Sequence, residues 1–122
     1  MDEIKRYDVN EFWAHSGIVR AGDFYFLSYC AGNAEASIER QVCEAFDGME
    51  KRLALAGLTL ENVVHMDCLF KNIWDIPVME KVIQERFHGK YPARKSIQTE
   101  FADPSPRRFQ VDAIAYSEKR EE

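Results

Sequence analysis

The sequence is poor in the residues from which several kinds of functional site are built. Its three cysteines, Cys30, Cys43 and Cys68, are odd in number and widely spaced, and no Cys-x-x-Cys or His-x-x-x-His spacing accompanies them. This pattern indicates reduced thiols rather than a disulfide framework. The three histidines do not cluster at a ligand spacing either, so we expect no metal site.

Long apolar runs and basic clusters are also missing. No apolar stretch approaches the roughly 18 residues that a membrane span requires, and the N-terminus has no apolar signal core. With 16 Lys and Arg against 21 Asp and Glu, the formal net charge is -5, which argues against nucleic acid as a partner. We therefore expect a cytoplasmic protein that binds neither membrane nor nucleic acid.

Two catalytic motifs are absent as well. The six glycines are scattered and form no phosphate-binding loop, and no serine lies in the Gly-x-Ser-x-Gly elbow that exposes a nucleophile. What remains is an ordinary globular composition, with 46% hydrophobic and 30% charged residues. The 122 residues suffice for a single domain over 1–122, whose charged end, 117–122, we expect to be frayed.

Two helices are predicted from apolar residues that recur every three or four positions. Ser37 is a credible N-cap for the first helix, which should end near Gly57 because glycine readily adopts the left-handed C′ conformation. Asp75 is placed to cap the second helix, which Gly89 should stop. Thr59 begins a single turn between the first helix and the strand that follows it.

Strands are predicted where apolar and polar residues alternate. Gly-Asp between two β-rich runs predicts a hairpin of two strands. Residues 4–13 are too weakly patterned to assign. The expected strands are 17–20 and 24–29 in the hairpin, then 63–70, 97–101 and 108–116.

This order of elements predicts an α+β fold with one sheet and both helices on one of its faces. In 63–70 the alternation places Val64, Met66, Cys68 and Phe70 toward the helices. The opposite face then mixes polar and apolar residues, a composition that suits a wet interface between subunits, so we expect a homo-oligomer. The expected members of this face are His65, Asp67, Gln98, Glu100, Gln110 and Asp112, with Val63, Leu69 and Ile114.

Arg94 follows a stiffened segment of the chain. Pro92 fixes its own φ and disfavours the helical region for Tyr91, so the backbone that approaches Arg94 has little freedom. A guanidinium held in this way can receive a carboxylate or phosphate. Asp112 on the last strand is a candidate base, but from residue types alone a structural salt bridge between Arg94 and Asp112 is the favoured reading.

Four segments in order resemble the RidA/YjgF family, whose members have also been called translation inhibitors or L-PSP endoribonucleases. They are Val19-Arg20-Ala21-Gly22-Asp23, Leu53 through Val64, Tyr91-Pro92-Ala93-Arg94, and Val111-Asp112-Ala113-Ile114-Ala115. The resemblance implies a chorismate-mutase-like α+β fold and a homotrimer whose sheets form a central barrel, with clefts between subunits. It also implies hydrolysis of reactive enamines and imines such as 2-aminoacrylate to a keto acid and ammonia, without a cofactor.

The same resemblance assigns roles to individual residues. Arg94 matches the arginine that holds the substrate carboxylate, and Asp112 matches an acid that orients the attacking water. His15, Tyr29 and Cys30 stand at pocket positions where the family usually has tyrosine, glycine and a polar residue, and with Ser96 they form the expected substrate-binding set. Asp112 is one methylene shorter than the usual glutamate, and the loop over 31–37 is shorter than in the family.

Two functions from different classes therefore stay open. The first is an imine and enamine deaminase with Arg94 and Asp112 as its catalytic residues. The alternative is a non-catalytic protein that binds a small carboxylate metabolite in the cleft between subunits, which the shorter acid and the altered loop favour. Ribonuclease activity comes third, because an acidic chain without paired histidines lacks the usual acid/base couple.

Overall fold

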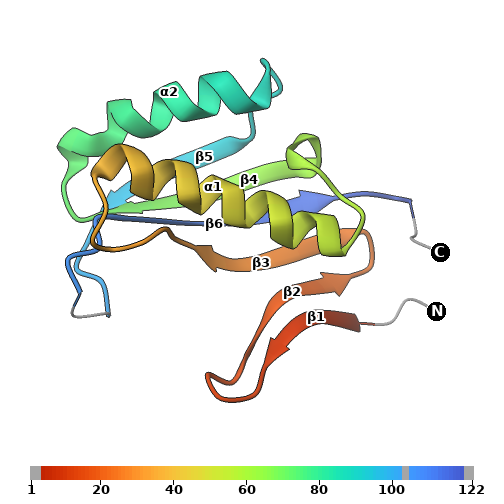
Figure 1. Cartoon of the computed structure of the whole chain (residues 1–122). Coiled ribbons are helices and arrows are strands. Elements are labelled where there is room, and N and C mark those ends of the chain that lie inside the picture. Colours follow the sequence, from red (N-terminus) through yellow and green to blue (C-terminus); the bar gives the residue numbers. More distant parts are fainter. Residues whose placement is uncertain (1–3, 103–104, 120–122) are drawn as a thin grey trace.

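Residues 4–102 and 105–119, which the computed structural model describes, form one six-stranded sheet with two helices on one face (Figure 1). The strand order is β1-β2-β3-β6-β4-β5. Neighbouring strands are antiparallel except β4 and β5, which are parallel because α2 crosses between them. The elements are β1 Ile4–Asn10, β2 His15–Ala21, β3 Phe24–Cys30, α1 Ile38–Leu55, β4 Val63–Phe70, α2 Ile76–Phe87, β5 Ala93–Gln98 and β6 Phe109–Tyr116, with single turns η1 Leu60–Asn62 and η2 Ile73–Asp75.

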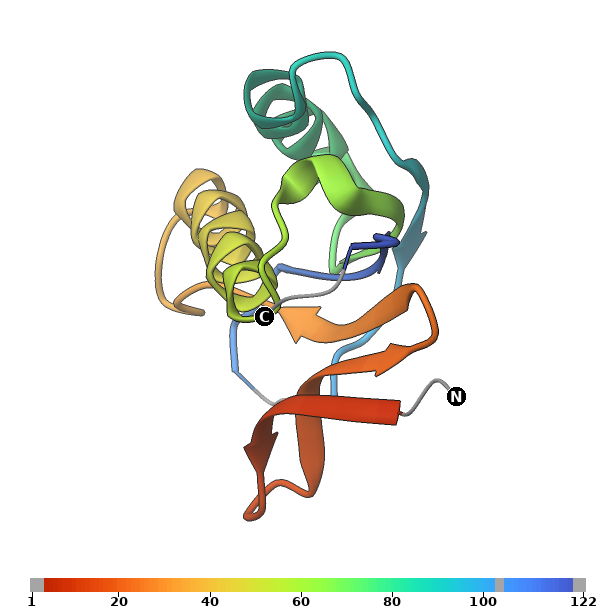
Figure 2. The ribbon, with the colours of Figure 1, turned by 90° about the vertical axis from the view of Figure 1, so that its right-hand side faces the viewer.

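The core lies between the helices and the central strands. Figure 2 shows α1 and α2 on the same side of the sheet, with its other face uncovered. The aromatic rings of Phe46, Phe87, Phe109 and Phe70 pack together across this layer, with centroids 5.2 to 6.2 Å apart. The prediction of an α+β fold with one sheet and two helices is confirmed.

The hairpin and the first helix form where the sequence predicts them. Gly22 turns β2 into β3 with a φ of 65°. The Ser37 side chain accepts a hydrogen bond from the Arg40 amide at 3.2 Å, as an N-cap should, and Gly57 follows α1 with a φ of 75°. The unassigned segment 4–13 contains β1, which pairs with β2.

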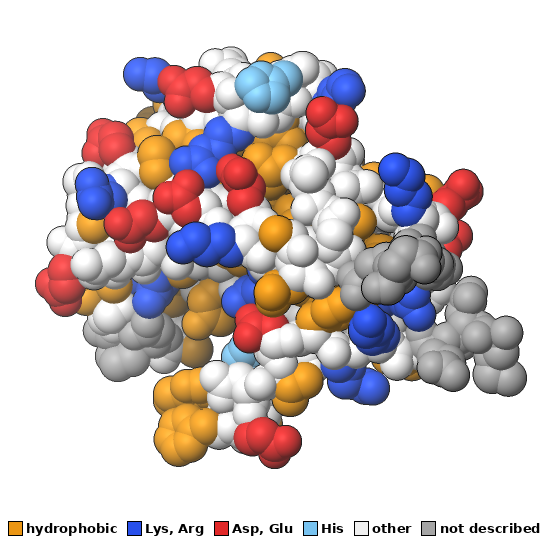
Figure 3. Space-filling view, turned by 45° about the vertical axis from the view of Figure 1, so that its right-hand side comes forward, with side chains coloured by type: hydrophobic (Ala, Val, Ile, Leu, Met, Phe, Trp, Pro, Cys, Tyr) orange, Lys and Arg blue, Asp and Glu red, His pale blue; other side chains and the backbone are white. Residues whose placement is uncertain are grey.

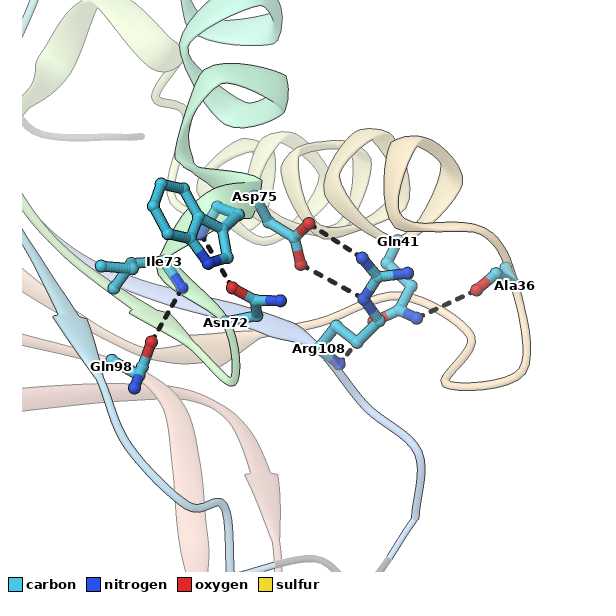
Figure 4. A network of polar contacts seen from close by, with 8 residues as sticks. Ala36, Gln41, Asn72, Ile73, Asp75, Gln98 and Arg108 are labelled. Atoms are coloured by element: carbon cyan, nitrogen blue, oxygen red, sulfur yellow. Dashed lines mark hydrogen bonds and ion pairs between the residues drawn. The ribbon is translucent and has the colours of Figure 1, made fainter.

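Asp75 occupies the predicted N-cap position of α2, but it does not cap the helix with its side chain. Its side chain makes no capping bond, because both carboxylate oxygens accept from the Arg108 guanidinium, at 2.8 and 3.2 Å. Figure 4 shows this pair within a polar network that also includes Gln41, whose side chain accepts from the Arg108 amide. The side chain of Asn72 caps the preceding turn η2 instead, by accepting from the Trp74 amide.

The alternation predicted for β4 fails at its first two residues. The register between β4 and β6 shifts between Val63 and His65, so Val63 is buried and Val64 is 43% exposed. This irregularity, a β-bulge, lets two residues occupy the space of one and reverses the faces on one side of it. From Met66 onward the predicted faces are correct.

The strand predicted at 97–101 is displaced in the structure, because β5 runs from Ala93 to Gln98 and Arg94 lies within it. Its faces are reversed as well. Arg94, Ser96 and Gln98 lie opposite Met66, Cys68 and Phe70, the residues of β4 that face the helices. Lys95 and Ile97 are therefore on the open face, and Gln98 is not. An edge strand that α2 covers only in part can place polar side chains toward the helix layer, where the Gln98 side chain accepts from the Ile73 amide at 3.0 Å.

The far end of β6 is tied to the hairpin. The Ser117 amide donates to the Asp23 carbonyl at 2.9 Å, and Ser117 is buried, although the frayed tail was predicted to begin there. The last three residues of that tail, 120–122, lie outside the described residues. Within the described ranges, no helix combines the length and the apolar character that crossing a bilayer requires.

Candidate functional site

Arg94 lies at the edge of the sheet, beside a hollow of about 300 Å³. Tyr91, Pro92 and residues of α2 line this hollow together with Arg94. The Arg94 guanidinium donates to the Glu80 carboxylate on α2 at 3.0 Å and more weakly to the Ser96 hydroxyl at 3.4 Å. About 30% of the Arg94 side chain is exposed, so an incoming anion can reach the guanidinium.

Asp112 lies in the middle of β6 on the open face, directly opposite Asp67 of β4. Partial burial and the Asp67 charge raise the pKa of Asp112 above its ordinary value, while the nearby His65 works in the opposite direction. The His65 ring nitrogen lies 3.0 Å from the Asp67 carboxylate, and the Lys95 ammonium lies 3.7 Å from it. His65, Asp67 and Asp112 border a hollow of about 240 Å³ on the open face.

Arg94 and Asp112 do not meet within one chain. Arg94 is in register with Met66, which faces the helices, whereas Asp112 is in register with Asp67, which faces away from them. The strand β4 lies between the two residues, and they extend from opposite faces of the sheet. The salt bridge that residue types alone favoured therefore does not form, and Glu80 takes its place as the partner of Arg94.

A third group of predicted site residues gathers at the end of β3. His15, Tyr29 and Cys30 line one cavity of about 530 Å³, beside the start of β2 and the side of α1. Ser96 is not among them, because it lies next to Arg94 on β5. The structure thus brings three of the four predicted substrate-binding residues together and separates the fourth.

The thiol in this cavity is a poor nucleophile. Burial raises the pKa of Cys30, and the neighbouring Arg52 guanidinium only partly offsets that rise. The more deeply placed Cys68 has its pKa raised to about 12, also chiefly by burial. Both cysteines are therefore neutral, packed side chains near pH 7.

Sequence reasoning missed three residues beside the predicted site: Glu80, Arg52 and Arg107. Glu80 pairs with Arg94, and the two arginines line the cavity that contains His15. For Arg52 a signal was present, since Gly48 precedes it by one helical turn and a glycine inside a helix is costly. In the sequence, Arg107 stands out only because it is next to Arg108, and this pair does not indicate a cavity.

Similarity to known proteins agrees with the fold. The family described as Endoribonuclease L-PSP matches residues 10–117. A hypothetical protein of the yjgF family from Streptococcus pyogenes M1 GAS is 62% identical, covers 98% of this chain and 100% of its own, and superposes with a TM-score of 0.92.

More distant relatives support the fold alone. A YjgF/YER057c/UK114 family member from Mycobacterium tuberculosis is 19% identical over 94% of this chain and 100% of its own, with a TM-score of 0.85. Yeast Mmf1 is 19% identical over 84% of this chain and 86% of its own, with a TM-score of 0.76. No curated protein matched the chain. The family match over most of the sequence and the 62% identical relative show that this chain belongs to the YjgF, or L-PSP, family.

Proposed function

We propose that the protein hydrolyses reactive enamines and imines of the 2-aminoacrylate kind to a keto acid and ammonia, without a cofactor. Water adds to the C=N bond, the C–N bond breaks, and the nitrogen leaves as ammonia. The observation that carries the proposal is the accessible Arg94 guanidinium beside its hollow, in a chain of the YjgF family. Arg94 would hold the substrate carboxylate through paired hydrogen bonds.

The site requires a second copy of the chain. Arg94 and Asp112 lie on opposite faces of one sheet, and His15, Tyr29 and Cys30 line a different cavity from that of Arg94. The proposal therefore includes a homotrimer in which neighbouring subunits complete each cleft. The uncovered sheet face supports association, because it leaves Phe24, Phe26 and Ile97 40 to 45% exposed beside half-buried polar residues.

Asp112 is proposed to orient or activate the attacking water. Its raised pKa makes its carboxylate a stronger base than an ordinary aspartate. Ser96, His15, Tyr29 and Cys30 are proposed to contact the substrate around the reacting carbon.

Release of ammonia from imines generated by an amino-acid oxidase tests the proposal. We expect Arg94→Ala to lower kcat/KM about 100-fold, because the substrate loses its positioning contact. Lys90→Ala is the control, since it removes a cation from the segment that leads into β5. The partner of Lys90 is Glu61 on the surface. Equal rates for wild type and Arg94→Ala, or no ammonia from any imine, would contradict the proposal. Light scattering at the assay concentration reports whether the trimer is present.

A non-catalytic binding protein is the second candidate. The observation that favours it is the separation of Arg94 from Asp112 within one chain, which leaves a carboxylate anchor without an adjacent base. A binder should be stabilised by small carboxylates in proportion to RT ln(1 + [L]/Kd) while releasing no ammonia. If pyruvate and its analogues leave the melting temperature unchanged, this candidate fails.

A further inference from the structure

Two guanidinium groups line the cavity beside α1 in a chain that is acidic overall. Two arginines, Arg52 and Arg107, line this space of about 530 Å³, and none of the described residues that line it is acidic. The whole chain has a formal net charge of -5. A local excess of guanidinium groups in a concave site favours an anionic ligand. Figure 3 shows the molecule hollowed where the projecting end of the β1–β2 hairpin meets the body.

Arg52 is fixed in this cavity without losing its charge. It lies in the last turn of α1 and donates from one guanidinium nitrogen to the carbonyls of Ser28 and Tyr29 at 2.9 and 3.1 Å. These acceptors are neutral, so they orient the guanidinium and leave its positive charge in place. The Asp8 carboxylate lies 3.8 Å away with 53% of its side chain exposed, which makes that pair a weak one.

Arg107 is held on the cavity wall by a backbone acceptor. Its guanidinium donates to the Gly32 carbonyl at 2.7 Å. Gly32 is itself packed closely on α1, because a Cβ there would lie 2.8 Å from the Gln41 carbonyl oxygen. The Arg107 guanidinium is therefore bonded to a part of the backbone that packs directly on α1.

The part of α1 that lines this cavity carries no side chain at Gly48. Gly48 lies one turn before Arg52, and a Cβ built on Gly48 meets nothing within 4 Å. Glycine inside a helix costs stability relative to alanine, so its presence here is not explained by packing. The missing side chain leaves open space next to the Arg52 guanidinium.

We propose that Arg52 and Arg107 bind a second acidic group of the ligand. Each guanidinium can form paired, charge-assisted hydrogen bonds with a carboxylate, and the cavity volume suits a small molecule. This inference rests on the proposed function, since His15, Tyr29 and Cys30 of the same cavity are assigned there to the substrate.

The substrate class then becomes imines of dicarboxylic amino acids, such as 2-iminosuccinate and 2-iminoglutarate. Their α-carboxylate would be held by Arg94, and the side-chain carboxylate by Arg52 and Arg107. Water adds to the C=N bond and ammonia leaves, which yields oxaloacetate or 2-oxoglutarate without an oxidant. An imine that carries one carboxylate would lack the second contact and bind more weakly.

Calorimetric titration with succinate and propionate tests the inference on the intact protein, without turnover. We expect succinate to bind at least tenfold more tightly than propionate at equal pH and ionic strength. Arg107→Gln should weaken succinate binding about 10- to 100-fold, the usual effect of losing a charge-assisted pair, and leave propionate unchanged.

Two further variants separate a local effect from a general one. Arg52→Gln should act like Arg107→Gln. Because it also removes the bonds from Arg52 to the end of β3, its fold is first checked by circular dichroism. Arg40→Gln is the matched control, because this arginine is on the same helix, outside the cavity lining, with 73% of its side chain exposed. It should bind succinate like wild type.

Turnover separates this inference from the proposed function. The ratio of kcat/KM for 2-iminoglutarate to that for 2-iminopropanoate should exceed ten in wild type and fall toward one in Arg107→Gln. Equal affinities of wild type for succinate and propionate, or undiminished succinate binding by Arg107→Gln, would overturn the inference. If no imine is turned over while the succinate preference depends on Arg107, the deaminase proposal fails and the anion site stands.

Discussion

The Arg94 guanidinium donates to the Glu80 carboxylate at 3.0 Å, so the residue expected to hold a substrate carboxylate already holds one from its own chain. Glu80 comes from α2 and Arg94 from β5, and both side chains remain partly exposed. A ligand carboxylate must therefore compete with Glu80. Ion pairs of this exposure contribute little to stability, typically up to about 1 kcal/mol.

Glu80→Gln should strengthen the binding of small carboxylates up to about fivefold, because it removes the competitor for Arg94. The free energy of unfolding should change by less than about 1 kcal/mol. Titration with pyruvate measures the first effect and urea denaturation the second. Glu85→Gln, which removes the same charge from an exposed position on the same helix, should leave pyruvate binding unchanged. Weaker binding by Glu80→Gln would indicate that Glu80 positions Arg94 rather than competing with the ligand.

The regular elements were predictable where one face of an element is fully buried. In β6 the residues alternate between buried and half-buried along the whole strand, and the predicted faces are correct. In β5, an edge strand, both faces are partly exposed, and polar residues such as Ser96 and Gln98 can face the helix layer. An alternating pattern in such a strand does not reveal which face is which.

The candidate site was predictable only in part, because its partners come together through tertiary packing. The sequence shows that Pro92 restricts the backbone before Arg94. The pairing of Arg94 with Glu80, however, depends on how α2 is rotated against β5. Arg52 bonds to backbone carbonyls 23 and 24 residues earlier in the chain, and no side-chain pattern records such acceptors. The separation of Arg94 from Asp112 likewise follows from strand order, since β4 lies between their strands.

We expect the ion pair between Asp75 and Arg108 to contribute to the free energy of unfolding. Only 8% of the Asp75 side chain is exposed, and its two oxygens accept from the Arg108 guanidinium at 2.8 and 3.2 Å. Asp75→Asn keeps the shape but removes the charge, so we expect a loss of about 2 kcal/mol in the free energy of unfolding, measured with urea at pH 7. This loss is smaller than is usual for a fully buried ion pair, because 43% of the Arg108 side chain is exposed.

A double-mutant cycle separates this pair from its surroundings. Arg108→Gln should also destabilise the protein, and the double variant should lose less than the sum of the two single losses, with a coupling of about 0.5–3 kcal/mol. Strict additivity would show that the two side chains stabilise the fold through other contacts.

Asp112 should make stability depend on pH. Burial and the Asp67 charge raise its pKa in the folded chain, so folding favours the protonated form. The stability gained in this way is fully present below the unfolded pKa, about 3.9, and is lost as the pH rises through the folded pKa. Asp112→Asn should therefore raise the melting temperature at pH 7, and the difference from wild type should shrink as the pH falls toward 4.

Melting curves of wild type and Asp112→Asn between pH 3.5 and 7 check this expectation. Glu100→Gln serves as the control, since the Glu100 side chain is 89% exposed and should show little pH-dependent difference. A lower melting temperature for Asp112→Asn at pH 7 would mean that the ionised carboxylate is stabilised in the fold, contrary to the sign worked out above.

Gly48 and Gly57 provide a comparison in which the same substitution should have opposite effects. A Cβ on either glycine meets nothing within 4 Å, but Gly48 lies inside α1, whereas Gly57 has a φ of 75°. Gly48→Ala should raise the free energy of unfolding by about 0.5–1 kcal/mol, because alanine restricts the unfolded chain and suits a helix. Gly57→Ala should lower it by about 1 kcal/mol or more, because a side chain strains the left-handed conformation.

Gly48 also borders the cavity that contains Arg52, so a larger side chain should affect binding more than stability. Gly48→Leu is expected to fold and to weaken succinate binding at least tenfold, because the leucine occupies the space next to the guanidinium. Urea denaturation and succinate titration on the three glycine variants measure both effects. If Gly48→Leu binds succinate like wild type, the ligand does not enter the space beside Arg52. If Gly48→Ala destabilises the protein, the glycine is required by the helix itself and not by the cavity.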